Sequence, residues 1–211
     1  LRCGAGLVQV ATRPEHVAAL VARAPEVMPR GVNCADELTP MLEAADVLVV
    51  GPGLGQSHWS LQLLQLALAT GKPLVLDADA LNMLAAGMLG GSRLVGNWVL
   101  TPHPGEAARL LGCTTAAVQS DRFAAVRALQ QRYGGVIILK GNGTLITGGG
   151  DTLLSDYGNP GMASGGMGDV LSGVIGALFA QHLPPLEAAA LGVCLHGAAA
   201  DSAAGEGQRG L

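Results

Sequence analysis

The chain has 211 residues, of which 49% are hydrophobic and 13% charged, and its formal net charge is −4. The net charge argues against a nucleic-acid-binding surface, which would need clustered lysines and arginines, and the composition disfavours disorder. No apolar run reaches the roughly 20 residues of a membrane span, and no signal-peptide pattern is present, so we expect a cytoplasmic protein without a membrane segment. The four cysteines lie far apart in the sequence, which predicts reduced and mostly buried thiols.

Apolar runs with strand character alternate with helical patterns through the middle of the chain. Strands are predicted at 46–50, 73–77, 97–101 and 135–139, and helices at 61–70, 79–86, 105–111 and 121–133. Such alternation predicts a mainly parallel sheet with helices on both faces. Residues 144–154 predict a β-hairpin, because three consecutive glycines separate two apolar runs, and two more helices are predicted at 168–181 and 186–204. No linker or repeat interrupts the pattern, so we expect one α/β domain over 1–211.

Each predicted parallel strand is followed by a loop of unusual composition. The four loops read GPGLGQ, DADALN, TPHPGE and KGNGT in chain order. Ligands of open α/β sheets bind outside the carboxyl ends of the strands. We therefore expect these loops to share one edge of the sheet, where the glycine-rich stretch before the predicted helix at 168 can join them.

The sequence GGMGD opens that helix. The backbone N–H groups of Gly165, Gly166, Met167 and Gly168 can converge as an anion hole, to which the helix N-terminus adds partial positive charge. Asp169 is then placed to take a proton from an attacking hydroxyl. The alternative is that Asp169 only caps the helix. The segment lacks the GxxxxGK[ST] spacing of a P-loop.

These motifs resemble one known family. GPGLG, DADALN, TPHPGEAARLLG, LKGNGT and GNPGMASGGMGDVLSG stand in the order found in the ADP/ATP-dependent NAD(P)H-hydrate dehydratases of the ribokinase-like superfamily, and the resemblance covers 1–211. It implies a ribokinase-like α/β fold with a β-hairpin near the nucleotide. By this resemblance, we expect the given sequence to lack the strand and glycine-rich loop that usually precede GAGLV and the usual C-terminal continuation after Leu211. A start at Leu1 is compatible with excision from a fusion with an NAD(P)H-hydrate epimerase domain.

The resemblance also implies an activity and the residues that serve it. ADP or ATP, with Mg²⁺, would phosphorylate the C6 hydroxyl of the S-form of hydrated NADH or NADPH (NAD(P)HX), and loss of phosphate would restore NAD(P)H. Asp169 is implied as the catalytic base, with the amides of 165–168 as the anion hole. The nucleotide is assigned to Lys140, Gly141, Asn142, Gly143, Thr144 and Gly168, and the hydrate is assigned to Gly53, His103 and Asp169.

Several interpretations stay open from the sequence alone. Asp77 and Asp79 could order the substrate or a metal ion, or cap a helix, and no metal ligand is assigned. Glu106 suits the first turn of a helix, and His196, five residues before Asp201, is expected to be buried and hydrogen-bonded. Two rival functions are a ribokinase-like kinase of a vitamin precursor or sugar, and an inactive nucleotide-binding sensor. We also expect a homo-oligomer.

Overall fold

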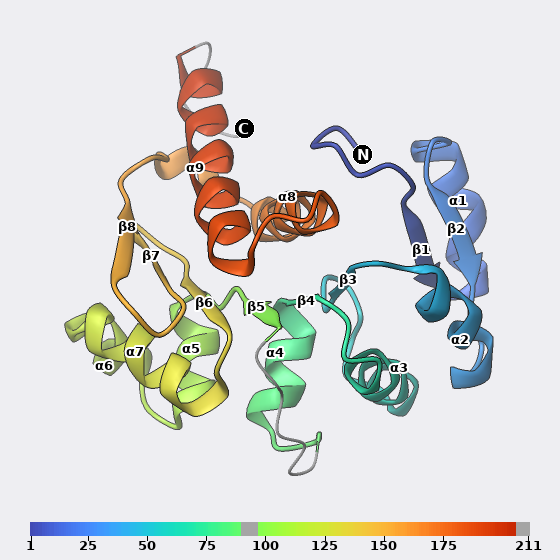
Figure 1. Cartoon of the computed structure of the whole chain (residues 1–211), viewed down its shortest axis with the longest axis horizontal. Coiled ribbons are helices and arrows are strands. Elements are labelled where there is room, and N and C mark those ends of the chain that lie inside the picture. The colour runs from blue at the N-terminus through green and yellow to red at the C-terminus, as the bar shows by residue number, and fades with distance from the viewer. Residues whose placement is uncertain (90–96, 206–211) are drawn as a thin grey trace.

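A computed structural model describes residues 1–89 and 97–205, and its main feature is a six-stranded sheet (Figure 1). The strand order follows the sequence: β3 (Leu48–Val50), β4 (Leu74–Leu76), β5 (Trp98–Leu100), β6 (Val136–Leu139), β7 (Thr144–Thr147) and β8 (Thr152–Ser155). Strands β3 to β6 are parallel, whereas β7 and β8 are antiparallel to their neighbours. The predicted parallel sheet and the predicted hairpin are both confirmed.

Helices cover both faces of this sheet (Figure 1). One face carries α3 (His58–Ala69), α4 (Ala78–Ala85), α5 (Pro104–Leu111), α6 (Thr115–Ser120) and α7 (Arg122–Tyr133), and the other carries α8 (Met167–Ala180) and α9 (Pro185–Ala204). Successive residues of a strand face opposite sides, so β4 places Leu74 and Leu76 in one hydrophobic core and Val75 in the core under α8 and α9. Burial on both faces explains the continuous apolar runs in the sequence.

A second, two-stranded parallel sheet lies outside the main one. It pairs β1 (Gln9–Thr12) with β2 (Met28–Gly31), which are connected through the short helix η1 (Pro14–His16) and α1 (Val17–Arg23). Helix α2 (Ala35–Ala44) follows and leads to the main sheet. The sequence analysis predicted no element before residue 46. The sequence of β2, MPRG, has little strand character, because its four residues include a proline and an exposed arginine.

The predicted element boundaries agree with the structure to within three residues. The largest difference is at α3, which begins at His58 because Ser57 caps the helix and its Oγ accepts a hydrogen bond from the N–H of Ser60. Helix α6 was not predicted as a separate element. Its six residues are capped by Thr114 and end just before the next cap, Asp121.

The cysteine prediction is correct for pairing and wrong for burial. All four cysteines are free, but Cys3, Cys34 and Cys113 are exposed and Cys194 is only partly buried. Within residues 1–89 and 97–205, no helix is long and apolar enough to cross a membrane.

Candidate active site at the carboxyl end of the sheet

The loops after the four parallel strands meet at one edge of the sheet, as the sequence predicts. The N–H of Gly55, after β3, donates to Asp79 Oδ2, after β4, at 2.8 Å. The N–H of Lys140, after β6, donates to the carbonyl of Pro102, after β5, at 2.9 Å. Helix α8 reaches the same place, because Ser172 Oγ donates to Asp77 Oδ2 at 2.7 Å. Segments far apart in the sequence therefore form one cluster.

Asp77 lies at the centre of this cluster, with a side chain only 1% exposed. Its Oδ1 accepts hydrogen bonds from Lys140 Nζ at 2.8 Å and from the N–H of Ala78 at 2.9 Å. Burial raises the pKa of Asp77, but the charge of Lys140 and the hydrogen bonds from Lys140, Ser172 and Thr101 outweigh it and hold that pKa below its usual 3.8. Asp77 is thus a buried carboxylate whose two oxygens are already bonded to protein donors.

Asp79 has a different task, because it orders the glycine loop after β3. Besides the N–H of Gly55, it accepts a longer hydrogen bond of 3.4 Å from Gln56 Nε2. Within this loop Gly53 is exposed and has a φ of +63°. Among the described residues, no group of three or more His, Cys, Asp or Glu side chains could hold a metal ion. A role of Asp77 and Asp79 in ordering the substrate or a metal ion stays a prediction.

The glycine-rich segment 165–168 forms the N-terminus of α8. Gly166 is the N-cap residue, with a left-handed φ of +89° and no side-chain cap on the helix. A Cβ on Gly168 would lie 3.0 Å from Lys140 Nζ, so the missing side chain lets the backbone approach the ammonium group. Asp169 is the third residue of the helix rather than its N-cap, and it is exposed. Uncapped N–H groups, an ammonium and an exposed carboxylate are thereby brought together.

This arrangement is suited to an anion that reacts with a hydroxyl group. The helix N-terminus and Lys140 favour a phosphoryl group, and a carboxylate at the rim can accept a proton from the group that attacks it. The assignment of the individual N–H groups of 165–168 to an anion hole stays a prediction.

The KGNGT loop joins β6 to β7, and its residues Gly141 and Asn142 are exposed. Gly143 and Thr144 are partly buried, and Thr144 Oγ1 donates to the Gly141 carbonyl at 3.0 Å. Lys140 is not a solvated side chain, since it is only 19% exposed and is bonded to Asp77.

His103 and Glu106 form a capping box at the start of α5. His103 Nδ1 accepts from the N–H groups of Gly105 at 3.0 Å and Glu106 at 3.4 Å, while Glu106 Oε2 accepts from the N–H of His103 at 2.8 Å. The helix-start interpretation of Glu106 is confirmed. His103 stays half exposed at this edge of the sheet, so it keeps a surface for a ligand in addition to its cap.

Asp201 on α9 fixes the segment that precedes the anion-hole residues, a role that the sequence analysis missed. Its carboxylate accepts from the N–H of Gly158 at 2.9 Å and from Asn159 Nδ2 at 3.0 Å. Asn159 in turn caps the short helix η2 (Pro160–Met162). These hydrogen bonds hold the pKa of Asp201 below its usual value.

His196, on the same helix as Asp201, differs from its expected state. It is partly buried, but its Nε2 is buried without a hydrogen-bond partner in the described structure. Burial lowers the pKa of His196, and the nearby positive charge of Lys140 lowers it further.

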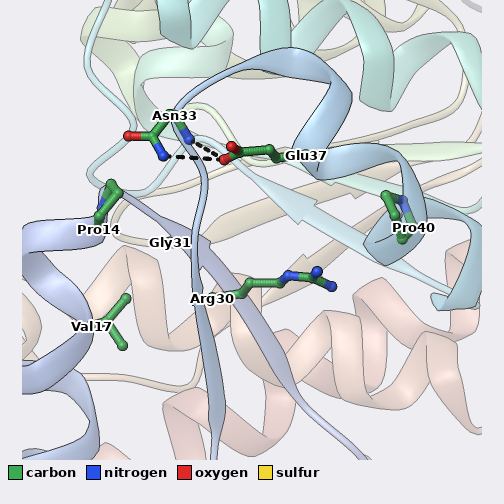
Figure 2. Close-up of a pocket in the computed structure, with 7 residues that line it drawn as sticks. All are labelled: Pro14, Val17, Arg30, Gly31, Asn33, Glu37 and Pro40. Atoms are coloured by element: carbon green, nitrogen blue, oxygen red, sulfur yellow. Dashed lines mark hydrogen bonds between the residues drawn. The ribbon is translucent and has the colours of Figure 1, made fainter.

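A cavity of about 550 Å³ lies elsewhere, between η1, α1, β2 and α2 (Figure 2). Its lining includes Arg30, Asn33 and Glu37, and Glu37 Oε2 accepts hydrogen bonds from the backbone and side chain of Asn33. None of the residues that the sequence analysis assigned to the site lines this cavity.

The sheet, its terminal hairpin and the glycine-started helix α8 have the ribokinase-like fold. The chain belongs to the NAD(P)H-hydrate dehydratase family, whose pattern it matches over residues 1–211. A bifunctional NAD(P)H-hydrate repair enzyme of Coxiella burnetii is 54% identical over 212 residues, covering 100% of this chain and 43% of the relative. This chain therefore spans less than half the length of that relative.

Two further similar proteins are named as dehydratases. An ADP-dependent (S)-NAD(P)H-hydrate dehydratase of Neisseria meningitidis is 46% identical over 188 residues, covering 87% of this chain and 62% of the relative. The crystal structure of an ADP/ATP-dependent NAD(P)H-hydrate dehydratase of Bacillus subtilis, co-crystallized with ATP and Mg²⁺ and soaked with CoA, superposes with a TM-score of 0.81 at 30% identity. That comparison covers 97% of this chain and 75% of the other.

Proposed function

We propose that this chain catalyses the nucleotide-dependent dehydration of the S-form of hydrated NADH or NADPH. The observation that carries the proposal is the exposed carboxylate of Asp169 beside the uncapped N-terminus of α8, with Lys140 next to Gly168. The names of the dehydratase relatives support the choice of substrate. ADP or ATP is the phosphoryl donor, and NAD(P)H is the product of the reaction rather than its cofactor.

Hydroxide is a poor leaving group and does not leave C6 of the hydrate readily, so the C6 hydroxyl is first phosphorylated. Asp169 accepts the proton of the C6 hydroxyl as its oxygen attacks the terminal phosphoryl group of the nucleotide, which breaks the bond to the bridging oxygen and releases AMP or ADP. The N–H groups of 165–168 stabilise the charge on the transferred phosphoryl group. The ring nitrogen lone pair then expels phosphate, and loss of the C5 proton restores the dihydronicotinamide.

The other assigned residues bind the two substrates. Lys140 and the backbone of 141–144 hold the nucleotide phosphates, and His103 and Gly53 contact the hydrate. Asp77 holds the Lys140 ammonium group by a hydrogen bond, and Asp79 holds the loop that contains Gly53 by its hydrogen bond from Gly55. These are binding and positioning tasks, which suits a reaction in which the nucleotide carries most of the charge.

Mg²⁺ fits this site as an ion that arrives with the nucleotide. When bound, it neutralises charge on the phosphates. Mg²⁺ typically keeps several waters and takes only one or two carboxylates besides substrate phosphates. The oxygens of Asp77 are bonded to Lys140, Ala78 and Ser172, and the described residues offer no group of three possible ligands, which is consistent with binding mainly through the nucleotide.

The wider context of the chain also stays a proposal. A cytoplasmic location is supported by the composition and by the lack of a membrane-spanning helix in the described residues. Fusion to an epimerase domain is supported by the name "bifunctional" of the Coxiella relative. A single catalytic domain over 1–211 and a homo-oligomeric state are proposed on the sequence alone.

A coupled assay tests the proposed function directly. The purified chain is mixed with the S-form hydrate, Mg²⁺ and either ADP or ATP, and NAD(P)H is followed by its absorbance near 340 nm while phosphate release is measured in parallel. We expect both signals to rise together and to require the nucleotide. A stable phosphorylated product without NAD(P)H would instead indicate a kinase, and tight ADP binding without turnover would indicate a sensor.

A further inference from the structure

Arg122, the first residue of α7, ties together the two ends of the KGNGT loop. Its Nη2 donates to the carbonyl of Leu139 at 3.1 Å and to the carbonyl of Gly143 at 3.0 Å, with a longer contact of 3.4 Å to the carbonyl of Lys140. Leu139 ends β6 and Gly143 immediately precedes β7. One guanidinium group therefore bridges the loop from the strand that enters it to the strand that leaves it.

Gly141 makes room for this guanidinium group. A Cβ at Gly141 would lie 2.5 Å from Arg122 Nη1, and the φ of Gly141 is +141°. The backbone conformation thus favours glycine here, and a side chain at this position would displace the guanidinium group, in addition to blocking any approach of a phosphate. Arg122 Nε is buried without a hydrogen-bond partner in the described structure, a cost that the contacts of the guanidinium head must offset.

The contacts of Arg122 also determine which groups the loop presents to the site. All described peptide bonds are trans, and a trans peptide directs its N–H opposite to its carbonyl. The Leu139 carbonyl faces Arg122, and the next N–H, that of Lys140, accordingly donates to Pro102 in the loop after β5. The same geometry turns the N–H of the exposed Gly141 away from the arginine.

Arg122 consequently controls the place of Lys140. The hydrogen bonds of Arg122 fix the backbone on both sides of Lys140, and so they fix the point from which its side chain extends. The Nζ of Lys140 lies 2.8 Å from Asp77 Oδ1 and close to Gly168 at the start of α8. Arg122 bonds to loop carbonyls, so it acts on the site through this loop rather than by contact with a substrate.

We propose that Arg122 is a positioning residue for the adenine nucleotide: it holds the KGNGT loop in the conformation that binds the phosphates. This inference rests on the proposed function, because it assigns the loop to ADP or ATP. It predicts a selective effect. Loss of Arg122 weakens nucleotide binding and leaves the affinity for the hydrate unchanged.

Calorimetric titration of the full chain with ADP and Mg²⁺ tests this, using Arg122→Ala, Arg122→Lys and the control Arg127→Ala. Arg127 lies on the same helix and is exposed. We expect Arg122→Ala to raise the Kd for ADP about tenfold or more, because the loop is no longer held in its binding conformation. Arg122→Lys should recover only part of the lost affinity, because an ammonium group cannot match the planar fork of the guanidinium. Arg127→Ala should match the wild type.

A rescue experiment separates positioning from general damage to the fold. Added guanidinium ion, at concentrations far below those that denature the wild type, should lower the Kd of Arg122→Ala for ADP and should not change that of Arg127→Ala. If Arg122→Ala does not fold, Arg122→Lys decides the matter by its KM values. A raised KM for ADP with an unchanged KM for the hydrate supports the proposal, and equal changes in both overturn it.

A double-mutant cycle with Gly141→Ala tests the contact itself. Gly141→Ala should weaken ADP binding less in the Arg122→Ala background, where the guanidinium group no longer occupies the space, than in the wild type. Full additivity, or unchanged ADP affinity in folded Arg122→Ala, would overturn the inference. Failure of the proposed function is a separate result, seen as a wild-type chain that binds no ADP or does not release NAD(P)H.

Discussion

Lys140 and Asp77, which are 63 positions apart in the sequence, form an ion pair of 2.8 Å between Nζ and Oδ1 at the start of α8. The carboxylate is almost fully buried, and the ammonium lies next to Gly168. The pair therefore does two things: it compensates a buried charge, and it fixes a cation where the proposed phosphoryl group binds. These two roles can be separated by experiment.

Replacing Lys140 alone should damage both stability and nucleotide binding. Lys140→Met leaves Asp77 as an unpaired buried carboxylate, and breaking such a pair costs about 3 kcal/mol of unfolding free energy. The double variant Lys140→Met with Asp77→Asn removes both charges and should recover most of that loss. ADP affinity should stay low in both variants, because the ammonium is absent from both.

Urea denaturation gives the stability of each variant, and calorimetric titration gives its affinity for ADP. A double variant as unstable as Lys140→Met would show that the charge of Asp77 is not the cause of the destabilisation. Wild-type ADP affinity in the double variant would remove Lys140 from the nucleotide site.

The Asp77 pair should also make stability depend on pH in the acid range. The pKa of Asp77 is lower in the folded protein than its usual 3.8, so the unfolded chain takes up the proton first as the pH falls. The pair therefore contributes its full stabilisation above the usual pKa of 3.8, and this stabilisation is lost as the pH falls through the lowered pKa of Asp77 in the folded protein. Subtracting the urea stability curve of Asp77→Asn from that of the wild type isolates this effect from other carboxylates, including Asp201. A difference that stays constant from about pH 6 to about pH 2 would contradict it.

Most of the main sheet could be predicted from the sequence, whereas the partners of the site residues could not. Runs such as DVLVV and PLVLD identify buried strands, and the loops after them must share one edge because parallel strands all point the same way. Nothing local connects Asp77 to Lys140 or Asp201 to Gly158, since these contacts bridge 63 and 43 positions. Arg122 carries no motif at all, and its role appears only when α7 is packed beside the end of β6.

The dual role of His103 was hidden for a related reason. Asparagine, aspartate, serine and threonine are the residues that normally indicate a helix cap, so the sequence analysis assigned His103 to the hydrate alone. In the structure its Nδ1 caps α5, which leaves the half-exposed ring beside the site with a structural duty as well. A loss of activity in a single alanine variant would therefore be ambiguous.

Two replacements of His103 resolve this ambiguity. His103→Ala should lower the unfolding free energy by about 1 kcal/mol through loss of the cap, and it should raise the KM for the hydrate. His103→Asn should keep the stability, because asparagine caps helices well, but should raise the KM for the hydrate as much as alanine does. ADP affinity should be unchanged in both variants. Steady-state kinetics with thermal unfolding checks each point, and wild-type kinetics in His103→Asn would leave the histidine as a cap only.

The final prediction concerns the proposed base, Asp169, in the first turn of α8. Asp169→Asn keeps the shape of the side chain and removes its ability to accept a proton, and general-base catalysis is typically worth ~10² to 10⁴ in rate. We therefore expect kcat to fall by about that factor. ADP affinity should be retained, because the N–H groups of 165–168 are unchanged and a negative charge near the phosphates is gone. Stability should change little, since Asp169 is exposed and the helix N-cap is Gly166.

The matched control for Asp169→Asn is Glu187→Gln, in the first turn of α9. Both replacements remove one negative charge from the N-terminal turn of a helix, so they share any loss of favourable interaction with the helix dipole. Only the first removes the proposed base. Turnover of the hydrate at saturating nucleotide, ADP affinity and melting temperature are measured for both. If folded Asp169→Asn turns over the hydrate as fast as Glu187→Gln does, Asp169 is not the base, and its carboxylate serves only the charge balance of the helix.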